Sequence, residues 1–157
     1  MKHVYLLGVK QYVFCAIDVF TKDAVLHIAS SPSSRNAKVC AQQAVQRFGN
    51  NVVFVNDNGS ENMKEVQEYL AEQGITQYWA HPRSPKEKPF VQRFIGTLQR
   101  EFLDYRYEPM NVREMQDEVA LWLQKYRCYR PHESLGFLTP QEFCATLGTP
   151  IPPDGVS

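Results

Sequence analysis

The segment Tyr12-Val13-Phe14-Cys15-Ala16-Ile17-Asp18-Val19-Phe20 is the strongest strand signal in the chain. It is rich in β-branched and aromatic residues, too short for a membrane span and too apolar for an exposed edge strand. Residues 2–9 and 24–29 also have strand character. The linkers between these segments, residues 8–11 and 21–23, are of hairpin length, so the three strands are predicted to form an antiparallel meander.

The chain then alternates between helical and strand patterns. Ser33 and Ser34 can cap a helix over about residues 35–48, which Gly49 ends. A short buried strand over 52–55, a helix over 63–73 and a strand over 75–79 follow. Because β-α-β units place their strands parallel, these two strands are predicted to be parallel. The prediction is an α/β fold with a five-stranded mixed sheet, three strands antiparallel and two parallel, flanked by helices.

The remaining sequence is mainly helical. Pro89 fits the first turn of a helix to about residue 105, a second helix is expected over 112–127, and Thr139-Pro140 predicts a last helix through 147. The proline-containing segment 80–88 is predicted to be a mobile loop. We expect one domain over residues 1–147, followed by a Pro-rich tail over 148–157.

Composition limits the function classes. Seventeen Lys and Arg residues balance 17 Asp and Glu residues, which argues against a chain that holds DNA tightly by charge alone. No apolar run reaches the roughly 20 residues of a membrane span, and the N-terminus lacks a secretory signal, so a cytoplasmic protein is expected. Four scattered cysteines without a metal-binding spacing predict reduced, mostly buried thiols. They are Cys15, Cys40, Cys128 and Cys144.

Asp57-Asn58-Gly59 directly follows the strand over 52–55. Asp, Asn and Gly are good turn residues, so a simple turn is the first interpretation. Ligands of open α/β sheets, however, bind beyond the carboxyl ends of the strands, where Asp57 lies. Magnesium prefers carboxylate oxygens, so Asp57 is a candidate metal ligand if further carboxylates join it.

Other candidates have simpler interpretations. Asp18 ends a strand and is expected to form a turn or a salt bridge. His132 has no Ser or Cys nucleophile at an interpretable position, so a structural role beside Pro131 is favoured over a base or ligand. An aromatic run could stack on bases, although helical spacing favours core packing for two of its members, Trp122 and Tyr126. The run comprises Tyr105, Tyr107, Trp122, Tyr126 and Tyr129.

Four segments, in this order and at these distances, carry a resemblance to a known family. They are Asp-Asn-Gly-Ser-Glu (57–61), His-Pro-Arg-Ser-Pro-Lys (81–86), Val-Gln-Arg-Phe-Ile-Gly-Thr-Leu-Gln-Arg-Glu-Phe (91–102) and the stretch from Tyr126 to Phe143 that contains Arg-Pro-His and Thr-Pro. Together they resemble the catalytic core of retroviral-type integrases and bacterial insertion-sequence transposases, over about residues 2–143. The resemblance implies a ribonuclease-H-like fold and a role in DNA integration or transposition.

The family holds two divalent ions with an Asp, Asp, Glu triad, and the ions activate a water or a DNA 3′-hydroxyl for attack on a phosphodiester. Asp57 corresponds to the second Asp, and the Glu position falls on Gln92, with 34 residues between the two. Lys2 resembles the Lys that follows the first Asp, so that Asp is expected before Met1. The loop Asn of the family is Lys88 here, and the Asn of its Tyr-Asn-x-x-Arg-Pro-His signature is Arg127.

The resemblance therefore implies catalytic and metal positions at Asp57 and Gln92. Because Gln is neutral, Mg²⁺ or Mn²⁺ is expected to bind weakly or not at all, and catalysis to be impaired. DNA-backbone contacts are expected at Lys86, Lys88, Arg93 and Arg100, with solvated surface charge as the alternative. The implied partners are DNA and further copies of the chain, in a homodimer or higher oligomer. A non-catalytic dimerisation or DNA-docking module and a ribonuclease-H-type nuclease are the alternative functions.

Overall fold

Three consecutive strands form an antiparallel meander in the computed structural model of the protein, which describes residues 2–6, 9–56, 64–80, 89–105 and 111–148. The strands β1 (Lys2–Leu6), β2 (Val9–Ile17) and β3 (Ala24–Ala29) pair in the order β1-β2-β3. The predicted meander is confirmed, although β2 begins three residues earlier than predicted and ends at Ile17.

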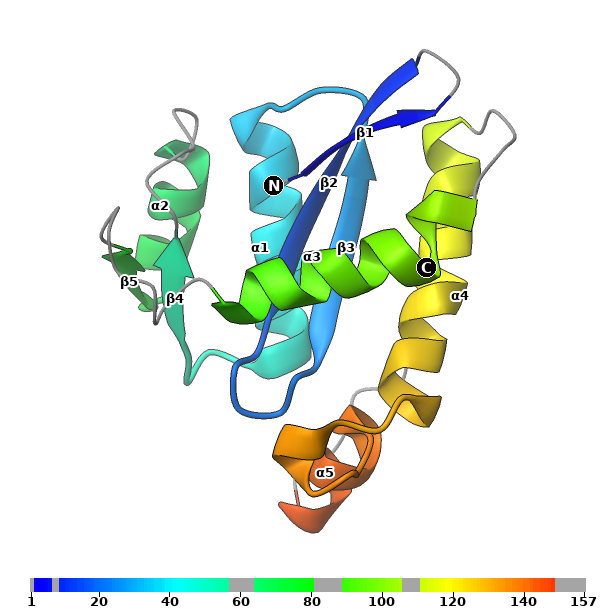
Figure 1. Ribbon diagram of the computed structural model, residues 1–157. Helices are drawn as coiled ribbons and strands as arrows, with labels where there is room; N and C mark the ends of the chain where they lie inside the picture. The colour runs from blue at the N-terminus through cyan, green and yellow to red at the C-terminus, as the bar shows by residue number, and fades with distance from the viewer. Residues whose placement is uncertain (1, 7–8, 57–63, 81–88, 106–110, 149–157) are drawn as a thin grey trace.

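A second, smaller sheet lies beside the meander. The strands β4 (Val53–Asn56) and β5 (Thr76–Trp79) pair in parallel, and the helix α2 (Lys64–Glu72) connects them. Their predicted direction is confirmed. Among the described residues, however, no ladder joins β4 to the meander, so the single five-stranded sheet is not observed. In Figure 1, β4 and β5 lie to one side of the meander, next to α2.

Helices cover both faces of the meander (Figure 1). On one face α1 (Ser34–Phe48) packs Cys40 and Ala44 against Phe14 and Val25. On the other face α3 (Pro89–Glu101) and α4 (Val112–Tyr129) enclose the larger core. Alternation of side chains along β2 and β3 supplies both cores, as expected for a sheet buried on two sides. The larger core contains Val13, Leu26, Ile28, Phe94, Leu98, Phe102, Met115, Val119, Trp122 and Tyr126.

The strand β4 is not buried as predicted. Val53 and Val55 are 56% and 54% exposed, whereas Phe54 between them packs against α1. An isolated apolar tetrapeptide cannot show whether one face or two faces of its strand are covered, because that depends on neighbouring elements. Only the Phe54 face of β4 contacts the core in the described structure.

Capping residues set the helix boundaries. The Ser33 hydroxyl accepts a hydrogen bond from the Asn36 N–H at the start of α1. Thr139 forms a reciprocal capping box with Glu142 at α5 (Pro140–Thr146), which confirms the prediction from Thr139-Pro140. The remaining elements are two short 3₁₀ helices, Leu103–Tyr105 after α3 and Glu133–Leu135 before α5. The helix α4 runs two residues beyond its predicted end.

Some predictions fall on other parts of the chain. The segment 81–88 and the tail from 149 lie outside the described residues, so their predicted character stays a prediction. None of the four cysteines, all of which lie in the described ranges, forms a disulfide, and only Cys40 is buried, while the other three are partly exposed. No helix in the described ranges is long and apolar enough to cross a bilayer.

A buried carboxylate joins the layers. Asp23 precedes β3 and is 6% exposed. Its Oδ2 lies 2.7 Å from Nε of Arg47 on α1, and its Oδ1 lies 2.7 Å from Nε of Arg127 on α4. Asp23 Oδ1 also accepts the Ala24 N–H, and Arg127 donates to the Ala24 carbonyl oxygen. One residue therefore connects a helix on each face of the sheet to the start of β3.

We predict that Asp23→Asn destabilises the fold by about 3–5 kcal/mol, because removing one member of a buried ion pair leaves its partners uncompensated. The measurement is urea-induced unfolding followed by circular dichroism. Asp117→Asn, at an exposed position on α4, is the matched control and should change stability by less than about 0.5 kcal/mol. Equal effects of the two substitutions would show that the ion pairs do not hold the layers together.

Candidate functional site

The helix α3 carries three of the predicted site residues, Gln92, Arg93 and Arg100. Phe94 and Leu98 are buried in the larger core, whereas Gln92 and Arg93 are exposed. Consecutive helical residues are about 100° apart around the axis, so Gln92 and Arg93 face different directions. Arg93 and Arg100, seven residues apart, lie on one face of α3.

The structure describes only part of the predicted catalytic and DNA-binding set. Gln92 is exposed on α3, and Arg93 and Arg100 line a common pocket described below. Asp57, Lys86 and Lys88 lie outside the described residues. Their roles, and the predicted approach of Asp57 to Gln92, therefore stay predictions.

The carboxyl end of β4 is nevertheless polar. Asn56, the residue before Asp57, has its carbonyl oxygen bonded to the Ala80 N–H at 2.7 Å, which extends the pairing of β4 and β5. Its side-chain Oδ1 is buried and has no hydrogen-bond partner within the described part of the chain. The Nε2 atom of Gln77, on the same face of this sheet, is also buried and has no hydrogen-bond partner among the described residues. Buried polar atoms normally have partners, so this end of the sheet is suited to a polar ligand or a further polar segment.

Asp18, which is predicted to form a turn or a salt bridge, has a structural role. Its carboxylate accepts hydrogen bonds from the Phe20 N–H at 2.9 Å and from the Thr21 hydroxyl at 2.7 Å. These bonds shape the turn between β2 and β3, which confirms the turn interpretation of Asp18. The residues that the structure describes contain no cluster of three His, Cys, Asp or Glu side chains that could hold a metal ion.

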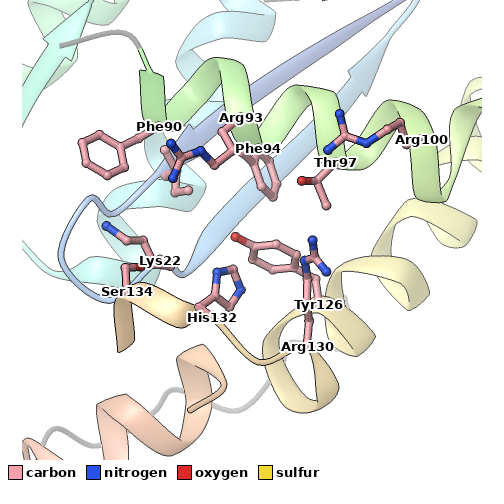
Figure 2. Close-up of a pocket in the computed structure, with 11 residues that line it drawn as sticks. Lys22, Phe90, Arg93, Phe94, Thr97, Arg100, Tyr126, Arg130, His132 and Ser134 are labelled. Atoms are coloured by element: carbon pink, nitrogen blue, oxygen red, sulfur yellow. The ribbon is translucent and has the colours of Figure 1, made fainter. Parts of the chain in front are cut away.

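A pocket of about 190 Å³ opens between α3, the β2–β3 turn and the end of α4 (Figure 2). From α3 it is lined by Phe90, Arg93, Phe94, Thr97 and Arg100. The remaining lining residues are Ile17, Lys22, Tyr126, Arg130, His132 and Ser134. Three segments far apart in sequence therefore build one cavity. Four of its side chains are ordinarily cationic: Lys22, Arg93, Arg100 and Arg130.

The cations that line this pocket affect the pKa values of their neighbours. Burial lowers the pKa of Lys22, and the nearby Arg93 lowers it further, although Asp18 acts in the opposite direction. Burial, with smaller contributions from Arg130 and Lys22, lowers the pKa of His132 to about 4. His132 is therefore neutral at pH 7. The Arg130 guanidinium lies 3.0 Å from the Glu101 carboxylate at the edge of the pocket.

Aromatic rings form the floor of the pocket. The Tyr126 ring packs edge-on against Phe94 and His132, with centroids 5.1 and 5.0 Å away. Burial raises the pKa of Tyr126, and Figure 2 shows its hydroxyl directed toward the cavity. Core packing of Trp122 and Tyr126 is confirmed. Tyr105 and Tyr129 are 69% and 78% exposed, which leaves base stacking open for them, and Tyr107 lies outside the described residues.

Sequence reasoning missed Lys22 and Arg130 as site residues. Lys22 lies in a turn with a φ of 60°, and its Nζ stands 4.1 Å above the Phe90 ring of α3. The sequence signal for Arg130 is the Arg-Pro-His motif, which indicates the family but not the pocket. No local pattern indicated that either residue would meet α3.

Comparisons with known proteins identify the relatives of this chain. A family model described as an integrase core domain matches residues 2–85, and a second model with that description matches residues 73–140. A putative transposase, InsD, of insertion element IS2E from Escherichia coli strain K12 is 25% identical over 146 residues, which cover 87% of this chain. The chain spans 66% of that protein and about half of several other curated insertion-sequence transposases.

Solved structures share the fold. The catalytic core domain of BIV integrase aligns with a TM-score of 0.70 at 18% identity, covering 94% of this chain and 93% of that one. The catalytic core domain of HTLV-2 integrase, solved in complex with magnesium, aligns with a TM-score of 0.69 at 16% identity and 90% coverage of both chains. The architecture is therefore the ribonuclease-H-like α/β fold of integrase cores.

We predict that the His132 imidazole titrates near pH 4, measured by NMR of its ring protons. Because this pKa lies below the unfolded value of about 6.5, the unfolded state binds more protons between these values. Stability should therefore fall as the pH falls from about 6.5 toward 4, and His132→Gln should reduce that loss. A titration midpoint at or above 6.5 would contradict the described environment of the ring.

Proposed function

The chain belongs to the integrase core domain family, and on this premise we propose that it is the core domain of a protein that transposes or integrates DNA. The observation that carries the proposal is the family-model match over residues 2–85, which is more than half of the chain. The transposase relatives and the shared fold of integrase cores support it. The substrate class is DNA, presented as the ends of a mobile element and a target.

The reaction of such a core is phosphodiester cleavage followed by strand transfer, for which the family uses divalent ions. In our proposal Asp57 extends from the carboxyl end of β4 and Gln92 from α3 toward a common point. Such a site would take Mg²⁺ or Mn²⁺, and the HTLV-2 relative supports this choice because it was solved with magnesium.

The residues present do not fit two dications. Asp57 supplies one carboxylate, whereas Gln92 supplies a neutral amide that lacks the charge of Glu. Asp18 is engaged in its turn, and the described residues offer no alternative cluster of ligands. We therefore propose that the chain as it stands is catalytically impaired, and we derive no catalytic step through a metal.

A second candidate function is a non-catalytic module that docks on DNA or joins further copies of the chain. Its supporting observation is the same neutral, exposed Gln92. In this function the proposed DNA contacts at Lys86, Lys88, Arg93 and Arg100 would bind the phosphate backbone without cutting it. Assembly as a homodimer or larger oligomer is part of both proposals.

We predict that the unmodified chain neither nicks DNA nor transfers strands, and that Gln92→Glu alone does not restore activity. Adding an N-terminal segment that supplies the first-strand Asp, together with Gln92→Glu, should produce Mn²⁺- or Mg²⁺-dependent cleavage of a cognate DNA end. The physical reason is that two dications held close together require several anionic ligands. The measurement is a strand-transfer assay on the three proteins side by side, with EDTA as the metal-free control.

The matched control is Asp57→Asn in the protein that carries both the added first-strand Asp and Gln92→Glu, since this substitution removes one charge at the same site. Robust metal-dependent activity in the unmodified chain would show that the ligands are misassigned, and Asp18 and Glu61 would then be the next residues to test.

A further inference from the structure

We propose that the basic pocket formed by Lys22, Arg93, Arg100, Arg130 and His132 is a seat for one phosphate group of a DNA strand. The choice of DNA as the source of the phosphate rests on the proposed function, whereas the anion chemistry rests on the pocket itself. Nothing in the arrangement requires Asp57, Gln92 or a metal ion.

Like charges from separate parts of the fold converge on this pocket. Lys22 comes from the β2–β3 turn, Arg93 from α3 and Arg130 from the end of α4, and all three line one cavity (Figure 2). Bringing cations together in a partly buried space is unfavourable unless an anion joins them. Asp18 partly offsets the charge of Lys22, and Glu101 pairs with Arg130. Arg93 and Arg100, by contrast, are in no ion pair within the described residues.

The pocket also contains an unsatisfied polar atom. His132 Nε2 is buried and has no hydrogen-bond partner in the described structure. The ring lies within the pocket between Lys22 and Tyr126 (Figure 2). A neutral imidazole can donate one hydrogen bond, and a phosphate oxygen is a suitable acceptor beside cationic groups.

The size and the remaining lining of the pocket also suit a phosphate group. A cavity of about 190 Å³ holds several groups of the size of a water molecule, at about 30 Å³ each. It therefore has room for a phosphate and the adjoining sugar atoms. The Thr97 and Ser134 hydroxyls line the same space and supply further donors, and the Phe90 ring offers an apolar surface for the sugar.

The pocket also accounts for DNA binding by a chain without net charge. Since the whole chain carries 17 cationic and 17 anionic side chains, a general attraction to DNA is weak. Concentrating several cations in one cavity creates a local positive potential that the net charge does not reveal. A phosphate held there would fix the position of a DNA strand along α3.

The test measures DNA binding by fluorescence anisotropy with a fluorescein-labelled duplex of about 20 base pairs, between about 50 and 200 mM salt. Lys22→Gln and Arg93→Gln should each weaken binding about tenfold and reduce the slope of log K against log salt by about one. Lys125→Gln and Arg113→Gln, at exposed positions on α4 outside the pocket, are the matched controls. They should change the affinity by less than about twofold. Urea unfolding of each variant verifies that it is folded.

A second measurement does not depend on DNA. Inorganic phosphate should shift the NMR signals of the His132 ring and raise its pKa from about 4, because a bound anion favours the imidazolium. Arg93→Gln should weaken this response, and Arg113→Gln should not.

The outcomes separate the two proposals. If the pocket variants and the control variants weaken DNA binding equally, the pocket is not the phosphate site. The proposed function is then unaffected. A phosphate response at His132 without any DNA binding supports the anion site and overturns DNA as its occupant. If Lys22→Gln and Arg93→Gln change neither the DNA affinity nor the phosphate-induced shift of the His132 signals, the inference is wrong.

Discussion

The carboxylate of Asp23 connects both faces of the meander, since it pairs with Arg47 of α1 and Arg127 of α4 through bonds of 2.7 Å. Desolvating an ion pair is costly, so such a cluster persists only where its geometry satisfies every charged group. Here the backbone of Ala24 completes the network on both its N–H and its carbonyl oxygen. The position of α4 relative to the sheet follows from this contact as well as from the apolar core.

The basic pocket depends on that position. Arg127 directly follows Tyr126 and shortly precedes Arg130 and His132 in the sequence. These three neighbours of Arg127 line the basic pocket. Anchoring Arg127 at the start of β3 therefore places these side chains opposite α3. Arg93, which lines the pocket, and Gln92, the predicted metal position, point in different directions around the axis of α3. In our proposals, binding a DNA strand and cutting it are therefore separable.

Local sequence patterns were sufficient for the meander, the parallel β4–β5 pair and the cap at Thr139-Pro140, because strand alternation and capping are properties of neighbouring residues. They were insufficient wherever distant segments meet. The pairing of Asp23 with Arg127 spans 104 positions, and the contact of Lys22 with α3 has no local signature. The exposure of Val53 and Val55 likewise depends on what covers β4. In the candidate site, motif order and spacing indicated Gln92 and Arg93, whereas the pocket itself required three-dimensional structure.

The central claim is that the carboxyl end of β4 and the start of α3 form one metal-dependent site of the integrase type, weakened by Gln92. Paramagnetic broadening of backbone amide NMR signals by Mn²⁺ tests this claim most directly. In Gln92→Glu, Mn²⁺ should broaden the amides around residue 92 and around Asn56 together, more strongly than in the unmodified chain, and Asp57→Asn should abolish the effect. Broadening confined to one of these segments, or unchanged by Asp57→Asn, would contradict the account.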